Sequence, residues 1–153
     1  MMRPTTTILI VEARFYTELA DELVKGAVAA LEAEGVIHHR LSVPGAFEIP
    51  AAISMAQKAA TGRPGLPCYD GYIALGCVIR GETTHYDYVC SESARALQDL
   101  ATKQHLAIGY GILTVENDEQ AWARADVTRK NKGADAANAC LRMIDIRRQF
   151  RLP

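Results

Sequence analysis

Two kinds of segment alternate along this chain. Short runs rich in Val, Ile and Leu cover positions 7–11, 36–43, 72–79 and 106–113, and each of them predicts a β-strand. The run 72–79 is almost continuously apolar, which predicts a strand that is buried on both faces.

Amphipathic segments separate these runs. After the first run, apolar residues recur at steps of three and four, at Leu19, Leu23, Ala27, Ala30 and Leu31. This spacing marks one face of a helix, and Gly35 marks the helix end. Further helices are predicted over 47–60, 84–103, 118–125 and 133–149. Residues 61–67 form the one clear loop by composition, and we interpret it as a surface insertion because it is too short to link domains.

This alternation predicts the fold class. Strand and helix alternate four times, so we expect one α/β domain over residues 1–153, with a four-stranded, mostly parallel sheet flanked by helices. The expected result is a three-layer sandwich with flavodoxin-like layering. Ligands of such sheets bind beyond the carboxyl ends of the strands, so the residues at those ends are the candidates for function.

The composition is typical of a soluble globular protein. Apolar residues make up 49% and charged residues 23%, as in soluble globular proteins, and the formal net charge of −1 disfavours bulk electrostatic binding of nucleic acid. The sequence has no run long enough to cross a bilayer and no secretory leader, so we expect a cytoplasmic protein. Its four cysteines lack CxxC spacing, which favours reduced thiols over a metal site.

The predicted strand ends carry aromatic, acidic and hydroxyl groups. Phe15 follows the first strand, Glu48 follows the second, and Tyr110 lies within the fourth. The two aromatic rings are suited to stacking on a flat heterocycle, although each is also compatible with a place in the core. Glu48 either binds ligand hydroxyls or simply lies at a water-accessible helix N-terminus, where the helix dipole favours a carboxylate.

Residues 76–89 contain several candidate functional groups close together in the sequence. Gly81 allows a tight turn after the third strand, and Thr84 with Asp87 forms a capping-box pattern that predicts the start of a helix at His85. Free amides at a helix N-terminus bind phosphate, and a histidine beside them can move protons. A single histidine at a helix start is also compatible with an ordinary surface position.

These segments together resemble the lumazine synthases of riboflavin biosynthesis. The resemblance runs from Ile8 to about Phe150. Its motifs are VPGAFEIP at 43–50, GCVIRGETTHYDYV at 76–89, YGILT at 110–114, EQA at 119–121 and NKG at 131–133.

The resemblance implies an activity and an assembly. The implied reaction condenses 5-amino-6-(D-ribitylamino)uracil with 3,4-dihydroxy-2-butanone 4-phosphate to give 6,7-dimethyl-8-ribityllumazine, phosphate and water. It implies no metal and no organic cofactor, and the net charge and the lack of a long apolar run predict no nucleic-acid or membrane partner. The implied assembly is a homo-oligomer, most simply a pentamer, with active sites between neighbouring subunits.

The resemblance also implies a role for each site residue. His85 is expected to carry protons, and Glu82, Thr83 and Arg124 to bind the phosphate. The residues expected to bind the ribitylaminouracil are Phe15, Ala46, Phe47, Glu48, Cys77, Val78, Ile79 and, from a neighbouring subunit, Tyr110.

The sequence departs from the family pattern at a few positions. Tyr110 replaces a common phenylalanine, and Glu82 replaces a smaller residue, so we expect only the Glu82 amide to face the phosphate. Residues 126–130 lack the glycines of the members that build icosahedral shells, which favours a bare pentamer.

Three other functions remain compatible with parts of the sequence. An archaeal-type riboflavin synthase has a related architecture but releases no phosphate. A non-catalytic flavin- or lumazine-binding protein, or a shell component, would not need His85 and Arg124. A flavodoxin-like nucleotide binder would not need the motifs above.

Overall fold

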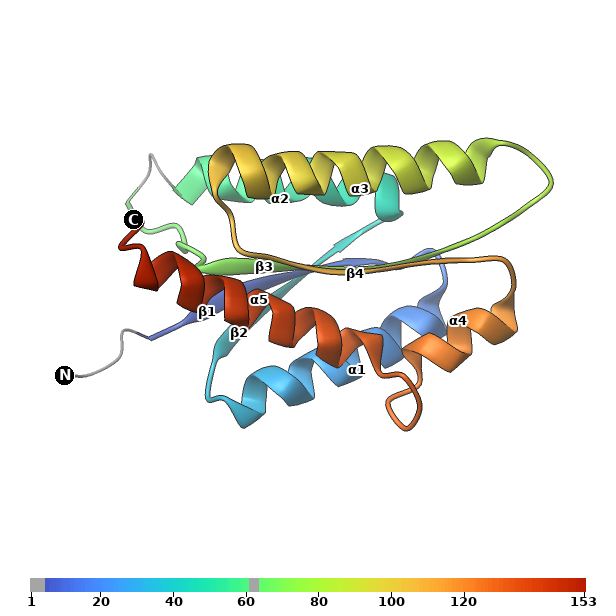
Figure 1. The fold of residues 1–153 in the computed structure, drawn as a ribbon, viewed down its shortest axis with the longest axis horizontal. Helices are drawn as coiled ribbons and strands as arrows, with labels where there is room; N and C mark the ends of the chain where they lie inside the picture. The colour runs from blue at the N-terminus through green and yellow to red at the C-terminus, as the bar shows by residue number, and fades with distance from the viewer. Residues whose placement is uncertain (1–4, 61–63) are drawn as a thin grey trace.

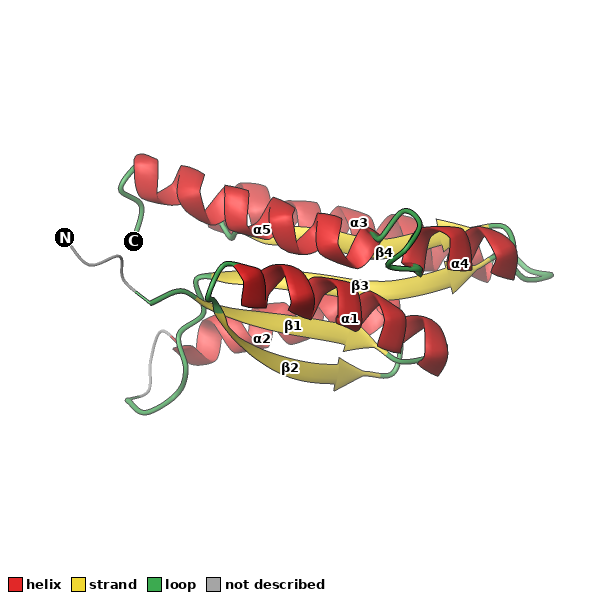
Figure 2. Ribbon diagram, turned by 90° about the horizontal axis from the view of Figure 1, so that it is seen from below, coloured by secondary structure: helices red, strands yellow, loops and turns green. Residues whose placement is uncertain are grey.

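Parallel strands form the middle layer of the protein. The computed structural model describes residues 5–60 and 64–153, and within them the chain forms one 4-stranded sheet in the order β2-β1-β3-β4, with every neighbouring pair parallel. All the strand arrows point to the same end of the molecule (Figure 2). The strands are β1 (Thr7–Ala13), β2 (Ile37–Val43), β3 (Gly71–Ile79) and β4 (Ile108–Val115).

Helices cover both faces of this sheet, which confirms the predicted three-layer architecture. One face carries α1 (Thr17–Ala33), α4 (Asp118–Ala125) and α5 (Lys132–Gln149), and the other carries α2 (Ile49–Ala60) and α3 (His85–Gln104) (Figure 1). A short 3₁₀ helix, η1 (Ala46–Glu48), precedes α2. None of the helices in the described ranges combines the length and apolar character needed to cross a membrane.

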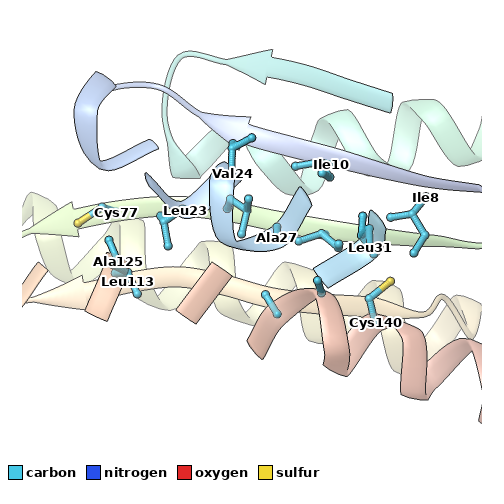
Figure 3. Packing of buried hydrophobic residues seen from close by; sticks show 14 of the residues in the cluster. Ile8, Ile10, Leu23, Val24, Ala27, Leu31, Cys77, Leu113, Ala125 and Cys140 are labelled. Carbon is cyan, nitrogen blue, oxygen red and sulfur yellow. The ribbon is translucent and has the colours of Figure 1, made fainter. Parts of the chain in front are cut away.

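The central strands are buried on both faces because each face has its own helices. Ile8 and Ile10 of β1 pack with α1 and α5 (Figure 3), whereas Leu9 and Val11 point toward α2 and α3. Strand β3 is fully buried from Gly71 to Cys77, as its apolar sequence predicts. Burial of this apolar surface supplies the main free energy of folding.

The predicted element boundaries are mostly close to those observed. The shifts reach two residues: β1 ends later than expected, α2 starts later because η1 precedes it, and β4 both starts and ends later. Leu106 and Ala107 are buried as strand residues would be, but they lie in the connection before β4. The predicted loop 61–67 lies partly outside the described residues, since the structure describes it only from residue 64 onward.

Helix α5 packs unusually close to its neighbours at two glycines. A Cβ added at Gly109 of β4 would lie 2.0 Å from the Ala136 carbonyl oxygen, and one at Gly133 would lie 2.1 Å from the Leu23 carbonyl oxygen. No side chain fits at either position without moving backbone atoms. The glycine of the NKG motif therefore has a packing role between α5 and α1.

The turn between α4 and α5 forms without glycine. Oδ1 of Asp126 accepts hydrogen bonds from the Thr128 backbone N–H and from its hydroxyl, at 2.8 and 2.7 Å. Asn131 then adopts the left-handed conformation, with φ 46°. The absence of glycine from residues 126–130 thus leaves the turn intact in this subunit.

The strand order predicts a ligand-binding crevice at the carboxyl ends of β1 and β3. The chain steps outward from β1 to β2, then returns past β1 to β3 and continues to β4. The connections after β1 and β3 therefore leave the sheet on opposite faces at adjacent carboxyl ends. Such a reversal point opens a crevice at which ligands bind in open α/β sheets.

Candidate functional site

A pocket of about 440 Å³ lies at the reversal point of the sheet. It is enclosed by the turn after β1, the segment after β2, the carboxyl end of β3 and the first turns of α3. Its lining residues are Phe15, Tyr16, Pro44, Gly45, Ala46, Phe47, Glu48, Cys77, Val78, Ile79, Gly81, Thr83, His85, Tyr86 and Val89.

The pocket brings together most of the residues singled out in the sequence. A larger hollow, of about 540 Å³, lies at the opposite, amino ends of the strands beside Asp70, Tyr72 and His105. That hollow contains none of the predicted site residues. We therefore take the smaller pocket as the candidate site, because the fold directs ligands to the carboxyl ends of the strands.

Two aromatic side chains stand open in this pocket. Phe15 is 73% exposed and Phe47 is 59% exposed, although both are large and apolar. The Phe15 ring meets Tyr16 edge-on, with ring centroids 4.9 Å apart, so the edge contact leaves the ring able to accept a stacked partner. Burial, with smaller electrostatic effects of Cys77 and Asp118, raises the pKa of Tyr16.

Cys77 forms part of the apolar wall. Burial raises the pKa of its thiol to about 12, so the group stays protonated at neutral pH. A protonated, buried thiol is a weak nucleophile and a weak metal ligand. Cys77 is thus a lining residue, and no group of three or more His, Cys, Asp or Glu side chains in the described ranges is placed to hold a metal ion.

Glu48 is exposed at the start of the helical segment after β2. Its backbone N–H donates to the Gly45 carbonyl at 3.2 Å, and its Oε2 would lie 3.4 Å from a Cβ added at Gly45. The carboxylate is open to water and needs no buried partner. Glu48 nevertheless lines the pocket beside Gly45, where ligand hydroxyl groups can donate to its carboxylate.

The loop between β3 and α3 starts the helix differently from the sequence prediction. The helix begins at His85 as expected, but within the described chain the Thr84 side chain makes no capping hydrogen bond. The capping-box prediction is wrong because Thr84 has helical backbone angles, φ −74° and ψ −3°, whereas a capping side chain needs an extended backbone. The hydroxyl of Thr83 instead accepts from the His85 N–H at 3.3 Å.

His85 lies exposed on the first turn of α3 and lines the pocket. Gly81 and Thr83 line it from the preceding loop. The pocket therefore joins an apolar wall with aromatic faces to a helix N-terminus that carries an imidazole. This arrangement suits a ligand that has a flat ring at one end and an anionic group at the other.

The sequence as a whole matches known proteins over nearly its full length. Residues 5–148 match the family model described as 6,7-dimethyl-8-ribityllumazine synthase. The chain belongs to this family. It is 57% identical to the 6,7-dimethyl-8-ribityllumazine synthase of Bartonella bacilliformis over 143 residues, which cover 94% of this chain and 91% of that protein. It is similarly 58% identical to 6,7-dimethyl-8-ribityllumazine synthase 1 of Rhizobium meliloti over 143 residues, covering 94% and 92% of the two chains.

Some residues expected at a lumazine synthase site lie elsewhere in a single copy of the chain. Tyr110 is 47% exposed and lines a separate hollow of about 350 Å³ between α3 and β4. Arg124 lies on α4, where its Nη1 donates to the Gln120 carbonyl at 3.0 Å. Glu82 is exposed and is absent from the pocket lining.

Some lining residues were missed in the sequence. Tyr86 and Val89 reach the pocket from α3, and Tyr16 reaches it from the turn after β1. The helical spacing of 85, 86 and 89 is the signal that could have identified the first two, since positions three and four apart share a helix face. Tyr16 carried no comparable signal beyond its place next to Phe15.

Proposed function

We propose that the pocket at the carboxyl ends of β1 and β3 is where this chain condenses 5-amino-6-(D-ribitylamino)uracil with 3,4-dihydroxy-2-butanone 4-phosphate. The products are 6,7-dimethyl-8-ribityllumazine, phosphate and water, and the reaction is the penultimate step of riboflavin biosynthesis. One observation supports this most strongly. A chain of this family gathers aromatic faces, a carboxylate, a helix N-terminus and His85 around a single pocket.

The apolar half of the pocket is proposed to bind the ribitylaminouracil. Phe15 offers an open ring face for the pyrimidine, and the end of β3 at Cys77, Val78 and Ile79 forms the wall beside it. Ala46, Phe47 and Glu48 would hold the ribityl chain, because their segment runs along the pocket rim. The Glu48 carboxylate would accept hydrogen bonds from ribityl hydroxyl groups.

The start of α3 is proposed to bind the butanone phosphate. Free backbone N–H groups and the helix dipole favour an anion at such a position. Thr83 lines the pocket there, and Glu82 precedes it in the same loop. We assign the phosphate contact of Glu82 to its amide, because its carboxylate would repel the ligand.

His85 is proposed to move the protons of the reaction. The amine of one substrate attacks the ketone of the other, and water leaves to give an imine. Phosphate is then eliminated, and the second amine adds to the carbonyl formed by that elimination, closing the ring with loss of a second water. Each bond change adds or removes a proton at a nitrogen or oxygen atom. A histidine between the ring site and the phosphate site can serve several of these steps. The remaining rate acceleration would come from holding both substrates in one pocket, which raises their effective concentration.

A neighbouring copy of the chain is proposed to complete the site. Tyr110 and Arg124 lie away from the pocket within one copy, yet Tyr110 is half exposed beside an uncovered hollow. A homopentamer with active sites between subunits would bring these two side chains to the ring and the phosphate of the next subunit. We place this assembly in the cytoplasm, in keeping with the four free thiols of the described chain.

The proposal is tested by supplying both substrates and measuring products. Formation of the lumazine chromophore with release of one phosphate per ring supports it. An archaeal-type riboflavin synthase would instead consume lumazine without releasing phosphate, and a binding protein would do neither.

A further inference from the structure

Arg80 connects the carboxyl end of β4 to the loop that carries His85. Its backbone N–H donates to the Val115 carbonyl at 2.9 Å, and its Nε donates to Oε2 of Glu116 at 2.9 Å. The connections after β3 and after β4 lie at the same end of the sheet (Figure 1). The backbone of Arg80 is thus held against the carboxyl end of β4, an edge strand of the sheet.

The same side chain also holds the two residues that follow His85. Nη2 of Arg80 lies 3.4 Å from Oδ1 of Asp87, and the guanidinium carbon lies 4.3 Å from the centre of the Tyr86 ring. The Tyr86 ring in turn lines the pocket. One planar guanidinium therefore binds β4 on one side and the first turn of α3 on the other, a geometry that lysine cannot reproduce.

These contacts contribute little to folding. The Arg80 side chain is 40% exposed, and its partners Glu116 and Asp87 are 56% and 59% exposed. Ion pairs this open to solvent add little net stability, because water screens the charges and two long side chains lose freedom. What the contacts do determine is geometry, since the loop from Gly81 to Thr84 has few buried residues to hold it.

We propose that Arg80 is a positioning residue that fixes His85 relative to the end of β3. The inference rests on the proposed function of His85. Arg80 itself is absent from the pocket lining and acts through Tyr86 and Asp87. Without it, the first turn of α3 would keep its helical form but would lose its ion-paired link to Glu116, the residue after β4.

The test compares Arg80→Gln, Arg80→Lys and the matched control Arg95→Gln in the full-length protein. Arg95 also pairs with two carboxylates on α3, Glu92 at 2.8 Å and Asp99 at 2.9 Å, but it lies outside the pocket. We expect Arg80→Gln to lower kcat by about ten- to a hundred-fold, as small misplacements of reacting groups do. The kcat of Arg80→Lys should fall between those of Arg80→Gln and the wild type. Arg95→Gln should keep the wild-type kcat, and the Tm of Arg80→Gln should equal that of the wild type.

Two further measurements separate positioning from other roles. In the His85→Ala background, Arg80→Gln should change kcat by less than about three-fold, because the two residues act as one unit. In protein with ¹³C-labelled histidine, the His85 signal, assigned by its loss in His85→Ala, should shift or broaden in Arg80→Gln and stay unchanged in Arg95→Gln.

The outcomes distinguish this inference from the proposed function. An unchanged His85 signal, an unchanged kcat, or an equal loss of kcat with and without His85 would each overturn the role of Arg80. The labelled-histidine measurement needs no turnover. Wild-type protein that forms no lumazine would reject the proposed function by itself.

Discussion

Arg40 of β2 donates two hydrogen bonds to the buried carboxylate of Glu12 of β1, from Nε to Oε2 at 2.8 Å and from Nη2 to Oε1 at 2.7 Å. Arg14 adds a third bond to Oε1, also at 2.8 Å. The side chain of Glu12 is only 3% exposed. Strand β2 forms one edge of the sheet and is largely exposed, and this cluster adds a charged side-chain link to the backbone ladder that joins it to β1.

Replacing Glu12 should weaken the fold in a pH-dependent way. Burial alone would raise the pKa of Glu12, but the hydrogen bonds and charges of Arg40 and Arg14 outweigh burial and lower it below its ordinary 4.5. A lowered folded-state pKa means that the stabilisation is complete above about pH 4.5 and disappears as the pH falls through the folded-state pKa. Glu12→Gln should therefore reduce the free energy of unfolding at pH 7 by about 1–3 kcal/mol.

Urea unfolding at pH 7, 5 and 3 checks this prediction. The difference between Glu12→Gln and wild type should shrink toward the lowest pH, where the wild-type carboxylate is itself protonated. The control is Asp99→Asn, which removes two exposed ion pairs of α3, to Arg95 and Lys103, and should have little effect at any pH. A difference that stays constant with pH would show that the charge of Glu12 is not the cause.

Removing the proposed proton carrier should slow turnover without abolishing it. We expect His85→Ala to lower kcat by about ten- to a thousand-fold, because general acid–base catalysis contributes in this range while positioning of the two substrates is retained. The measurement is steady-state formation of lumazine. His105→Asn, at the opposite end of the sheet and in the left-handed conformation that asparagine tolerates, is the matched control. A rate equal to wild type would remove His85 from the mechanism.

The orientation of Glu82 can be tested through phosphate binding. If only the amide of Glu82 faces the ligand, Glu82→Ala should change the inhibition constant of inorganic phosphate by no more than about three-fold, the effect of an exposed charge. Thr83→Val, which removes a hydroxyl from the pocket lining, should weaken phosphate inhibition more. A sharp gain in phosphate affinity in Glu82→Ala would mean that the carboxylate itself lies beside the phosphate.

The proposed shared site predicts complementation between two variants of reduced activity. His85→Ala damages the pocket of its own subunit, whereas Arg124→Ala would damage the pocket of a neighbour. Hybrids purified from co-expressed, differently tagged chains should then recover about a quarter of wild-type activity, since in a ring of random order that fraction of interfaces has both residues intact. Hybrids no more active than the parent variants would place Arg124 in the pocket of its own chain or outside the site.

The layers of this fold could be predicted because each element has a local signal. The run 72–79 is apolar enough to predict a strand buried on both faces, and β3 is buried in this way as far as Cys77, with Val78 and Ile79 half-buried. The start of α3 at His85 was also predicted correctly, but the side chain that accepts a hydrogen bond there was not. The choice between Thr83 and Thr84 depends on backbone angles that the sequence pattern does not specify.

Relations between distant segments were harder to predict. The contact of Arg40 with Glu12 joins residues 28 positions apart and depends on the parallel register of β1 and β2. The contacts of Arg80 likewise depend on β4 lying next to β3. Tyr110 and Arg124 could be identified as candidate site residues in the sequence, but neither lines the pocket in a single copy of the chain.

A stoichiometric assay decides whether this chain catalyses the proposed condensation. Purified protein is mixed with 5-amino-6-(D-ribitylamino)uracil and 3,4-dihydroxy-2-butanone 4-phosphate, and lumazine absorbance and phosphate are followed together against a protein-free reaction. We expect catalysed formation of 6,7-dimethyl-8-ribityllumazine with one phosphate released per ring, and a large loss of both signals in His85→Ala. Well-folded wild-type protein that forms lumazine no faster than the protein-free mixture would contradict the proposed function.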